Sequence, residues 1–178
     1  MLLTGTFVRT IDEQHRIAVP KPLREVLIAA HVDVLFVAPG TDGSLSLYSE
    51  EAFSELGHRL AQASPTSREV RDYGRLFYAR AIRAEIDQQG RIRIPKELVD
   101  LADLEKDVVL LGVQNHIELW DRDRWEIYFQ DKQAQYDEIA EAAFGYPATP
   151  NRDEMTAGQQ HQLSENEGPH VPALRTPK

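Results

Sequence analysis

The sequence contains Asp12-Glu13-Gln14-His15-Arg16-Ile17-Ala18-Val19-Pro20-Lys21, and the same pattern returns 75 positions later as Asp87-Gln88-Gln89-Gly90-Arg91-Ile92-Arg93-Ile94-Pro95-Lys96. Each copy has an Asp, an Arg four residues later, alternating apolar residues and then Pro-Lys. A pattern that recurs in fixed order is typical of a duplicated supersecondary unit. We therefore expect two copies of one unit in this chain.

Alternating apolar residues and turn residues predict the order β-β-α-β-β in each copy. The first copy has expected strands over 5–10, 17–19, 32–37 and 44–48, and its helix opens at Pro20. The second copy has expected strands over 79–86, 91–94, 107–112 and 116–120, and its helix opens at Pro95. Leu47-Tyr48 and Leu119-Trp120 match at a spacing of 72, which places three extra residues in the last turn of the first copy.

Helices are expected after each copy, and they set the predicted domain organisation. They cover 50–63, 66–78 and 122–144, with Ser49 and Asp121 as N-caps. From Gly145 onward the chain is poor in bulky apolar residues, which predicts a disordered tail. The expected parts are 1–63 (first unit with its helix), 64–78 (connecting helix), 79–145 (second unit with its C-terminal helix) and 146–178 (disordered tail).

Composition places the chain among soluble globular proteins. It has 178 residues, of which 42% are hydrophobic. Its longest apolar runs, near 32–38 and 108–113, are far shorter than the roughly 18 residues that a membrane span needs. The first residues do not form a secretory signal, so we expect a cytoplasmic protein that contacts no membrane. The absence of cysteine excludes disulfides, a cysteine nucleophile and thiolate zinc sites.

Charge is distributed unevenly along the chain. The net charge is −9, but residues 59–93 hold eight Arg against four acidic residues, whereas residues 97–141 hold thirteen acidic residues against four basic ones. Nucleic acid responds to the local patch and not to the total charge, so a basic face for DNA is compatible with this balance. Arginine-rich helices that are merely solvated remain the alternative.

The Asp-x-x-x-Arg turns are the candidate functional motifs. Asp12 and Asp87 can accept bonds from backbone amides of their turns, and Gly90 suits a turn position with positive φ. Arg16 and Arg91 open the next strands, where a two-stranded ribbon could present them to phosphates or guanine edges. The alternative is that each Asp and Arg simply pair across the turn.

Several segments together resemble the MraZ family. They are Gly5-Thr6-Phe7-Val8, Asp12-x-x-x-Arg16-Ile17-x-Val19-Pro20, Leu23-Arg24-Glu25, Asp87-x-x-Gly90-Arg91-Ile92-x-Ile94-Pro95, Val109-Leu110-Leu111-Gly112 and Glu118-Leu119-Trp120-Asp121 with Trp125. The resemblance runs from about residue 2 to residue 130, in order and with matching spacing.

The resemblance implies an α+β fold of two pseudo-symmetric AbrB-like swapped-hairpin units around a small β-barrel-like core, each followed by helices. It also implies a ring-shaped homo-oligomer that binds direct repeats of double-stranded DNA in the promoter of its own division and cell-wall gene cluster. Regulation in the family is usually repression, and a nucleoid-associated location follows. The first turn is the one that the family ties to DNA contact.

The first turn departs from the family form, Asp-x-Lys-Gly-Arg. Gln14 stands in place of the lysine and His15 in place of the glycine. A cation is lost, and a position expected to need positive φ holds a residue that tolerates it at a strain of about 1 kcal/mol or more. Arg16 is retained and His15 could contact phosphate, so we expect a shifted DNA preference. The expected DNA-binding residues are Arg16, His15, Gln14, Asp12, Arg9 and Lys21.

Two further basic groups allow two interpretations. Arg91, Arg93, Lys96, Asp87 and Gly90 could face DNA or a neighbouring subunit. Arg68, Arg71 and Arg75 share one helix face and could line a DNA path, but we favour pairing with the acidic helix of an adjacent protomer. The acidic residues available for that pairing are Glu126, Asp131, Asp137, Glu138 and Glu141.

No catalytic constellation emerges from the sequence. The six histidines lack metal-ligand spacing, and neither a GxSxG nor a phosphate-binding loop occurs. We expect no enzyme activity, no cofactor, no metal and no small-molecule substrate. The aromatic group Trp120, Trp125, Tyr128 and Phe129 is expected to be core packing.

The predicted function is therefore sequence-specific binding of double-stranded DNA in transcription regulation. A protein-interaction ring scaffold, or an antitoxin-like partner-binding module, is the alternative. Short G-rich direct repeats upstream of the chain's own gene would favour the regulator.

Overall fold

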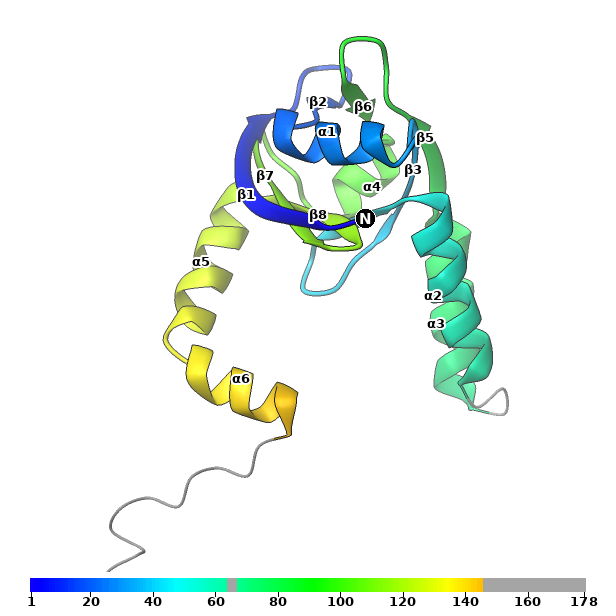
Figure 1. Ribbon diagram of the computed structural model, residues 1–178, viewed down its shortest axis with the longest axis vertical. Helices are drawn as coiled ribbons and strands as arrows, with labels where there is room; N and C mark the ends of the chain where they lie inside the picture. The colour runs from blue at the N-terminus through cyan, green and yellow to red at the C-terminus, as the bar shows by residue number, and fades with distance from the viewer. Residues whose placement is uncertain (64–66, 146–178) are drawn as a thin grey trace, which may run out of the picture. The chain divides into compact units, whose positions relative to one another are not determined.

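The computed structural model describes residues 1–63 and 67–145 (Figure 1). The predicted tail, 146–178, lies outside the described residues. Contacts divide the chain into two compact bodies, residues 1–131 and residues 132–178. The elements in chain order are β1 (Leu3–Thr10), β2 (Arg16–Ala18), α1 (Lys21–Ala29), β3 (Val34–Pro39), β4 (Leu45–Tyr48), α2 (Glu50–Gln62), α3 (Arg68–Arg80), β5 (Ile82–Glu85), β6 (Arg91–Arg93), α4 (Lys96–Leu101), β7 (Asp107–Gln114), β8 (His116–Asp121), α5 (Arg122–Gln133) and α6 (Tyr136–Phe144).

The strands of the two repeats are interleaved. A six-stranded antiparallel sheet has the order β1-β7-β8-β4-β3-β5, and a two-stranded sheet pairs β2 with β6. β1 and β2 of the first repeat therefore pair with β7 and β6 of the second, while β5 of the second pairs with β3 of the first. The predicted α+β class is confirmed. The barrel-like closure stays a prediction, because the end strands β1 and β5 are not paired with each other.

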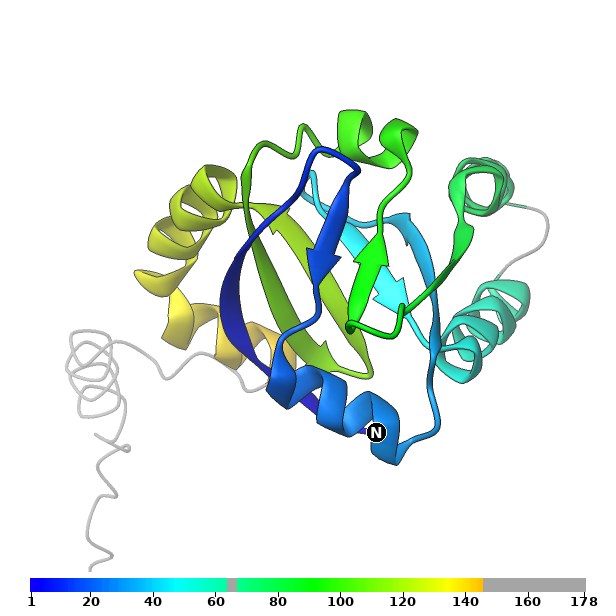
Figure 2. The same cartoon turned by 90° about the horizontal axis from the view of Figure 1, so that it is seen from above.

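The main core joins residues of the β2–β6 ribbon to residues of the large sheet. Figure 2 shows the ribbon in front of the sheet when the molecule is seen from above. Ile17 and Ile92, opposite each other in the ribbon, are 1% and 0% exposed. They pack with Val19 and Ile94 and with sheet residues such as Leu110. A three-residue strand cannot be stable alone, so each ribbon strand depends on its partner from the other repeat.

Helices cover the other face of the sheet at two places. Trp120 and Trp125 meet with ring centroids 5.5 Å apart, and Tyr128 packs beside them over Val109 and Leu111. The predicted aromatic packing is thus confirmed, although Phe129 at its edge remains about half exposed. At the second place the rings of α2 and α3 stack on those of β3 and β4, and the residues involved are Phe36, Tyr48, Phe53, Tyr73, Phe77 and Tyr78.

Two predictions about helices are wrong. The expected helix over 122–144 is broken, because Gln135 leaves the helical region with φ −109° and ψ 14° between α5 and α6. No glycine or proline marks this break in the sequence. The three extra residues of the first repeat are not in its last turn, since α1 has nine residues where α4 has six. The helix ends at Ala30 and Ala102 are consequently already 72 positions apart.

The helix starts follow the expected chemistry. The Ser49 hydroxyl accepts a hydrogen bond from the Ala52 amide at 3.2 Å, as an N-cap does. The Asp121 carboxylate accepts from the amides of Asp123 and Arg124 at the start of α5. Among residues 1–63 and 67–145, no helix is long and apolar enough to cross a membrane.

Gly112 makes the pairing of β1 with β7 possible, which leads to a prediction about stability. A Cβ at Gly112 would lie 2.4 Å from the Thr4 amide nitrogen and 2.6 Å from the Leu3 carbonyl carbon, which are backbone atoms that cannot turn aside. We expect Gly112→Ala to lower the free energy of unfolding by at least about 2 kcal/mol. Chemical denaturation monitored by circular dichroism measures this change.

Gly74 in α3 provides the matched control. Its nearest neighbour, a Leu60 methyl, would lie at an ordinary 3.5 Å from an added Cβ. Gly74→Ala should therefore raise the free energy of unfolding by about 0.5–1 kcal/mol through helix propensity. A Gly112→Ala chain as stable as the Gly74→Ala chain would contradict the close approach of β1 and β7.

Candidate nucleic-acid interface

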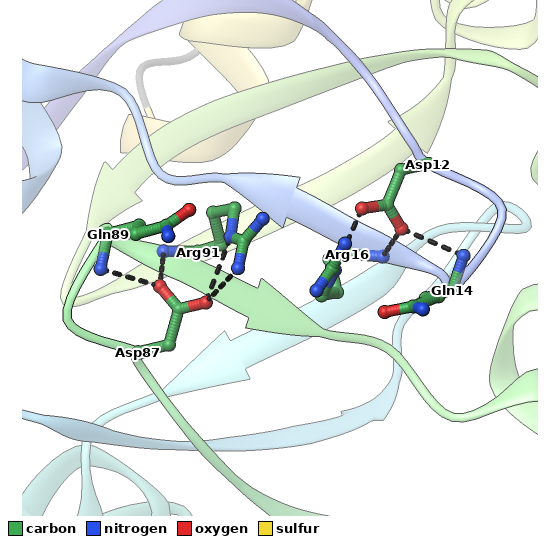
Figure 3. A network of polar contacts seen from close by, with 6 residues as sticks. All are labelled: Asp12, Gln14, Arg16, Asp87, Gln89 and Arg91. Atoms are coloured by element: carbon green, nitrogen blue, oxygen red, sulfur yellow. Dashed lines mark hydrogen bonds and ion pairs between the residues drawn. The ribbon is translucent and has the colours of Figure 1, made fainter.

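The first Asp-x-x-x-Arg turn is organised by one carboxylate (Figure 3). Asp12 Oδ1 accepts hydrogen bonds from the backbone amides of Gln14 and Arg16, both at 2.9 Å. Its other oxygen, Oδ2, accepts from Arg16 Nε at 2.8 Å. The pairing across the turn that was the simpler sequence interpretation is thus present. It holds the guanidinium in place by its Nε and leaves the terminal nitrogens outside this bond.

The backbone of this turn requires a residue with positive φ. The Asp12 amide donates to the Arg16 carbonyl at 3.0 Å, and the His15 amide donates to the Asp12 carbonyl at 2.8 Å. His15 closes the turn with φ 58°. This confirms the expected positive φ, and a non-glycine residue there stores strain of about 1 kcal/mol.

The second turn repeats the first, bond for bond. Asp87 Oδ1 accepts from the amides of Gln89 and Arg91 at 2.9 Å, and Oδ2 accepts from Arg91 Nε at 2.9 Å. Arg91 Nη2 also lies 2.8 Å from Oδ2. Gly90 closes this turn with φ 73°. The duplication therefore reproduces a complete hydrogen-bond network and not only a residue pattern.

These bonds stabilise the ionised form of both carboxyls. The pKa of Asp12 is lowered chiefly by the Arg16 backbone amide, then by the Arg16 guanidinium and the Gln14 amide, against an opposing effect of partial burial. The pKa of Asp87 is lowered chiefly by the Arg91 amide and then by the Arg91 guanidinium. Both turns are therefore ion pairs at neutral pH.

The β2–β6 ribbon brings the two turns onto one surface. Its register pairs Arg16 with Arg93 and Ala18 with Arg91, on the side opposite the buried Ile17 and Ile92. We name this side the arginine face, formed by Arg16, Arg91 and Arg93. The turns lie at opposite ends of the ribbon, so the arginine face spans both of them (Figure 3).

Each turn is also bound by the backbone of the other repeat. The Val19 amide donates to the Gly90 carbonyl at 2.9 Å, and the Ile94 amide donates to the His15 carbonyl at 2.8 Å. The sequence left open whether the second turn faces DNA or a neighbouring subunit. In the structure the two turns are parts of one surface, because each repeat holds the turn of the other.

The remaining predicted basic site residues outside the arginine face have other partners. Lys21 Nζ is 3.7 Å from Glu25, and Lys96 Nζ is 2.7 Å from Asp100, one turn along their helices. Arg9, on β1, donates from Nη1 to the Val8 carbonyl at 2.7 Å. The pairs of Lys21 and Lys96 are exposed and contribute little to stability, so both lysines are available to an anion.

Arg24 is a residue near the site that sequence reasoning missed. Its guanidinium lies over Gly90, and a Cβ at that glycine would be 2.1 Å from Arg24 Nη1 and 2.9 Å from Arg24 Cδ. The fourth residue of α4, at the position that Arg24 has in α1, is Val99. When the two repeats are aligned at a spacing of 75 residues, Arg24 stands against Val99 and His15 against Gly90. These two differences are the sequence signal that could have indicated Arg24.

Ion pairs within α3 balance part of its charge. Arg68 and Arg75 both pair with Asp72 of their own helix, at 3.4 and 3.2 Å, so part of the predicted basic stripe is already balanced. Among residues 1–63 and 67–145, no group of three or more His, Asp or Glu side chains is placed to hold a metal ion.

Comparison with known proteins agrees with this geometry. The family described as "MraZ protein, putative antitoxin-like" matches residues 77–146. A protein of Finegoldia magna named transcriptional regulator MraZ is 34% identical over 140 residues, which are 79% of this chain and 95% of that protein. The chain belongs to the MraZ family. MraZ proteins of Ligilactobacillus salivarius and Alkaliphilus metalliredigens, with the same printed name, are 39% and 37% identical over 79% and 78% of this chain, and 95% and 94% of their own lengths.

The lowered pKa values predict how the stability of this MraZ chain depends on pH. Both aspartates have a folded-state pKa below the usual 3.8, so their ionised forms favour folding. This contribution is complete above the unfolded-state pKa and is lost as the pH falls through the lower folded-state pKa. The loss should therefore appear below about pH 5 and continue toward about pH 2.

The variant Asp12→Asn/Asp87→Asn tests this dependence, since each amide oxygen can still accept from the turn amides. It should be less stable than the original chain at neutral pH but should lose less stability across that acid range. Urea denaturation at a series of pH values measures both. Equal losses for the two chains would show that the turn aspartates are not the source.

Proposed function

We propose that this MraZ-family chain is a DNA-binding transcriptional regulator, with the arginine face as its contact with double-stranded DNA. The observation that carries this proposal is the placement of Arg16, Arg91 and Arg93 on the solvent side of one two-stranded antiparallel ribbon. A ribbon of this width can enter a major groove, where arginine is the commonest reader of guanine. The names of the relatives support a role in transcription.

The turn aspartates prepare the arginines for this contact. Asp12 and Asp87 each bind the Nε side of a guanidinium, which fixes its plane before DNA arrives. A side chain that is already ordered loses less rotamer entropy on binding. Each aspartate also places one negative charge beside its arginine, which balances the charge of Arg16 and of Arg91. Arg93 has no ion pair among the described residues, so it supplies the net positive charge of the arginine face.

Self-assembly is the second part of the proposal. Two helices on the outer side of the large sheet expose large apolar side chains, with Leu76 of α3 60% exposed and Ile127 of α5 72% exposed. Exposed apolar residues on both helices fit an interface with further copies of the chain. A ring-shaped homo-oligomer would then present one arginine face per subunit to successive direct repeats, and weak contacts would sum through multivalency.

The target that we propose is the promoter of the chain's own division and cell-wall gene cluster, with repression as the result. A bound ring over a promoter would exclude the transcription machinery sterically. The first turn, with Gln14 and His15 in place of lysine and glycine, would set a sequence preference of its own. Its closed hydrogen-bonding pattern supports a functional turn despite these changes.

Arg16→Ala tests the assignment of the arginine face. Because a bidentate arginine contact contributes about 1–3 kcal/mol of base discrimination, we expect the preference for the native upstream duplex over a scrambled duplex to fall at least about fivefold. Arg91→Ala should act in the same direction. Fluorescence anisotropy measures the affinities, and light scattering confirms that the oligomer is intact.

Arg59→Ala, which removes an arginine from α2 on the other side of the sheet, is the matched control. It should leave the preference for the native duplex unchanged. An Arg16→Ala chain that still protects its own upstream region in a footprint, as the original chain does, would refute the assignment of this turn.

A charge at the exposed apolar positions tests assembly. The double variant Leu76→Glu/Ile127→Glu should reduce the mass of the oligomer, since an unpaired charge is costly inside an interface. Leu101→Glu, at an exposed position on α4, should leave the mass unchanged. Analytical ultracentrifugation measures the mass. The interface is elsewhere if the double variant sediments as the original chain does.

A protein-binding module is the second candidate function. The antitoxin-like term in the family description and the exposed apolar side chains favour it. It predicts that neither the native nor the scrambled duplex is bound at physiological salt. The anisotropy measurement described above therefore distinguishes the two functions directly.

A further inference from the structure

The two turns differ at one point, although their hydrogen bonds match. At the first turn, the residue with positive φ is His15, whose own side chain leaves the turn there. At the second turn the equivalent residue is Gly90, which has no side chain and is buried. The guanidinium of Arg24 covers it, with Nη1 only 2.1 Å from the place where a Cβ would stand. At the second turn, the guanidinium therefore fills the space into which a side chain on the positive-φ residue would extend.

The helices explain how this exchange is accommodated. Lys21 pairs with Glu25, and Lys96 pairs with Asp100, so the first turns of α1 and α4 correspond residue by residue. Arg24 and Val99 are the fourth residues of these helices. Val99 is short and buried in the core. Arg24 is long enough to reach the second turn, where its guanidinium occupies the space that a Cβ at Gly90 would need.

The surroundings of Arg24 leave its charge available. Among residues 1–63 and 67–145, no side chain forms a hydrogen bond or ion pair with its guanidinium, because Asp87 is bound to Arg91 and Glu25 to Lys21. The guanidinium lines an open cavity of about 360 Å³. Residues on the other sides of this cavity include Leu27, Asp33, Ile86 and Gln88. A cation at an open surface beside a DNA-contacting turn attracts a phosphate.

We propose that Arg24 is a further DNA-contact residue, which binds a backbone phosphate beside the second turn, where its guanidinium covers Gly90. This inference rests on the proposed DNA contact of the arginine face. In this arrangement the arginine face enters the groove, and Arg24 binds the DNA backbone beside the end of the ribbon. Arg24 then contributes affinity for any duplex, and the arginine face contributes the sequence preference.

The salt dependence of binding by the full chain tests this role. The probes are a duplex with the region upstream of the chain's own gene and a scrambled duplex of equal length. Arg24→Gln should reduce the slope of log K against log salt concentration by about 0.9 for each engaged subunit, equally on both duplexes. The affinity ratio between original and variant chains should then shrink about threefold between 50 and 200 mM salt. Arg24→Lys, which keeps the charge, should keep the slope.

Three results would overturn the proposal. The first is a weaker affinity of Arg24→Gln with an unchanged slope, which would mean that Arg24 only supports the turn. The second is an unchanged affinity and slope. The third is an equal change in slope for Arg59→Gln, which would indicate an effect of total charge. An original chain that binds neither duplex would instead refute the proposed function itself.

A double variant tests the exchange between the turns. Arg24→Val/Gly90→His builds the arrangement of the first turn at the second, so it should bind both duplexes more tightly than Arg24→Val alone. Gly90→His alone should melt at a lower temperature than the double variant, because its Cβ would meet Arg24. The backbone strain of a histidine is common to both and cancels in this comparison. A double variant that neither binds more tightly nor melts higher would contradict the exchange.

Discussion

The pairing of β2 with β6 is the constraint on which the rest of the molecule depends. Each of these strands is three residues long and has one apolar side chain between two outward ones. Neither can bury its isoleucine without the other, so two repeats must fold together around one ribbon. The same register that buries Ile17 and Ile92 directs Arg16, Arg91 and Arg93 to solvent. Stability and the candidate DNA contact therefore come from one set of hydrogen bonds.

The turn aspartates illustrate how an exposed ion pair can matter for function while contributing little to stability. Exposed pairs are generally worth less than about 1 kcal/mol, since water competes for both partners. In each turn, however, the carboxylate also accepts two backbone amides, and it thereby fixes the loop and the guanidinium together. Pairing across the turn and binding to DNA were alternatives at the level of sequence. In the folded chain the pairing is present, and in the proposed function it prepares the arginines for contact with DNA.

The repeats have diverged where their partners differ. The first turn carries His15, and Val99 stands in α4 at the position of Arg24, whereas the second turn carries Gly90 and lies under Arg24 of the opposite repeat. A swapped arrangement makes such compensation possible, because each turn is packed by residues more than 60 positions away in the sequence. A substitution in the turn of one repeat can thus be compensated by a residue of the other repeat.

Much of this protein was determined by the sequence alone. Local patterns predicted the order of the elements and the N-cap at Ser49, because these depend on neighbours in the chain. The resemblance to the MraZ family implied the α+β class and the positive φ at His15. Tertiary structure decided which strands pair, that both turns share the arginine face, and that Arg24 covers Gly90. It also decided the break before α6, where neither glycine nor proline stands. The reason is physical: local propensity acts over a few residues, whereas strand exchange and the approach of a distant guanidinium depend on which surfaces are buried together.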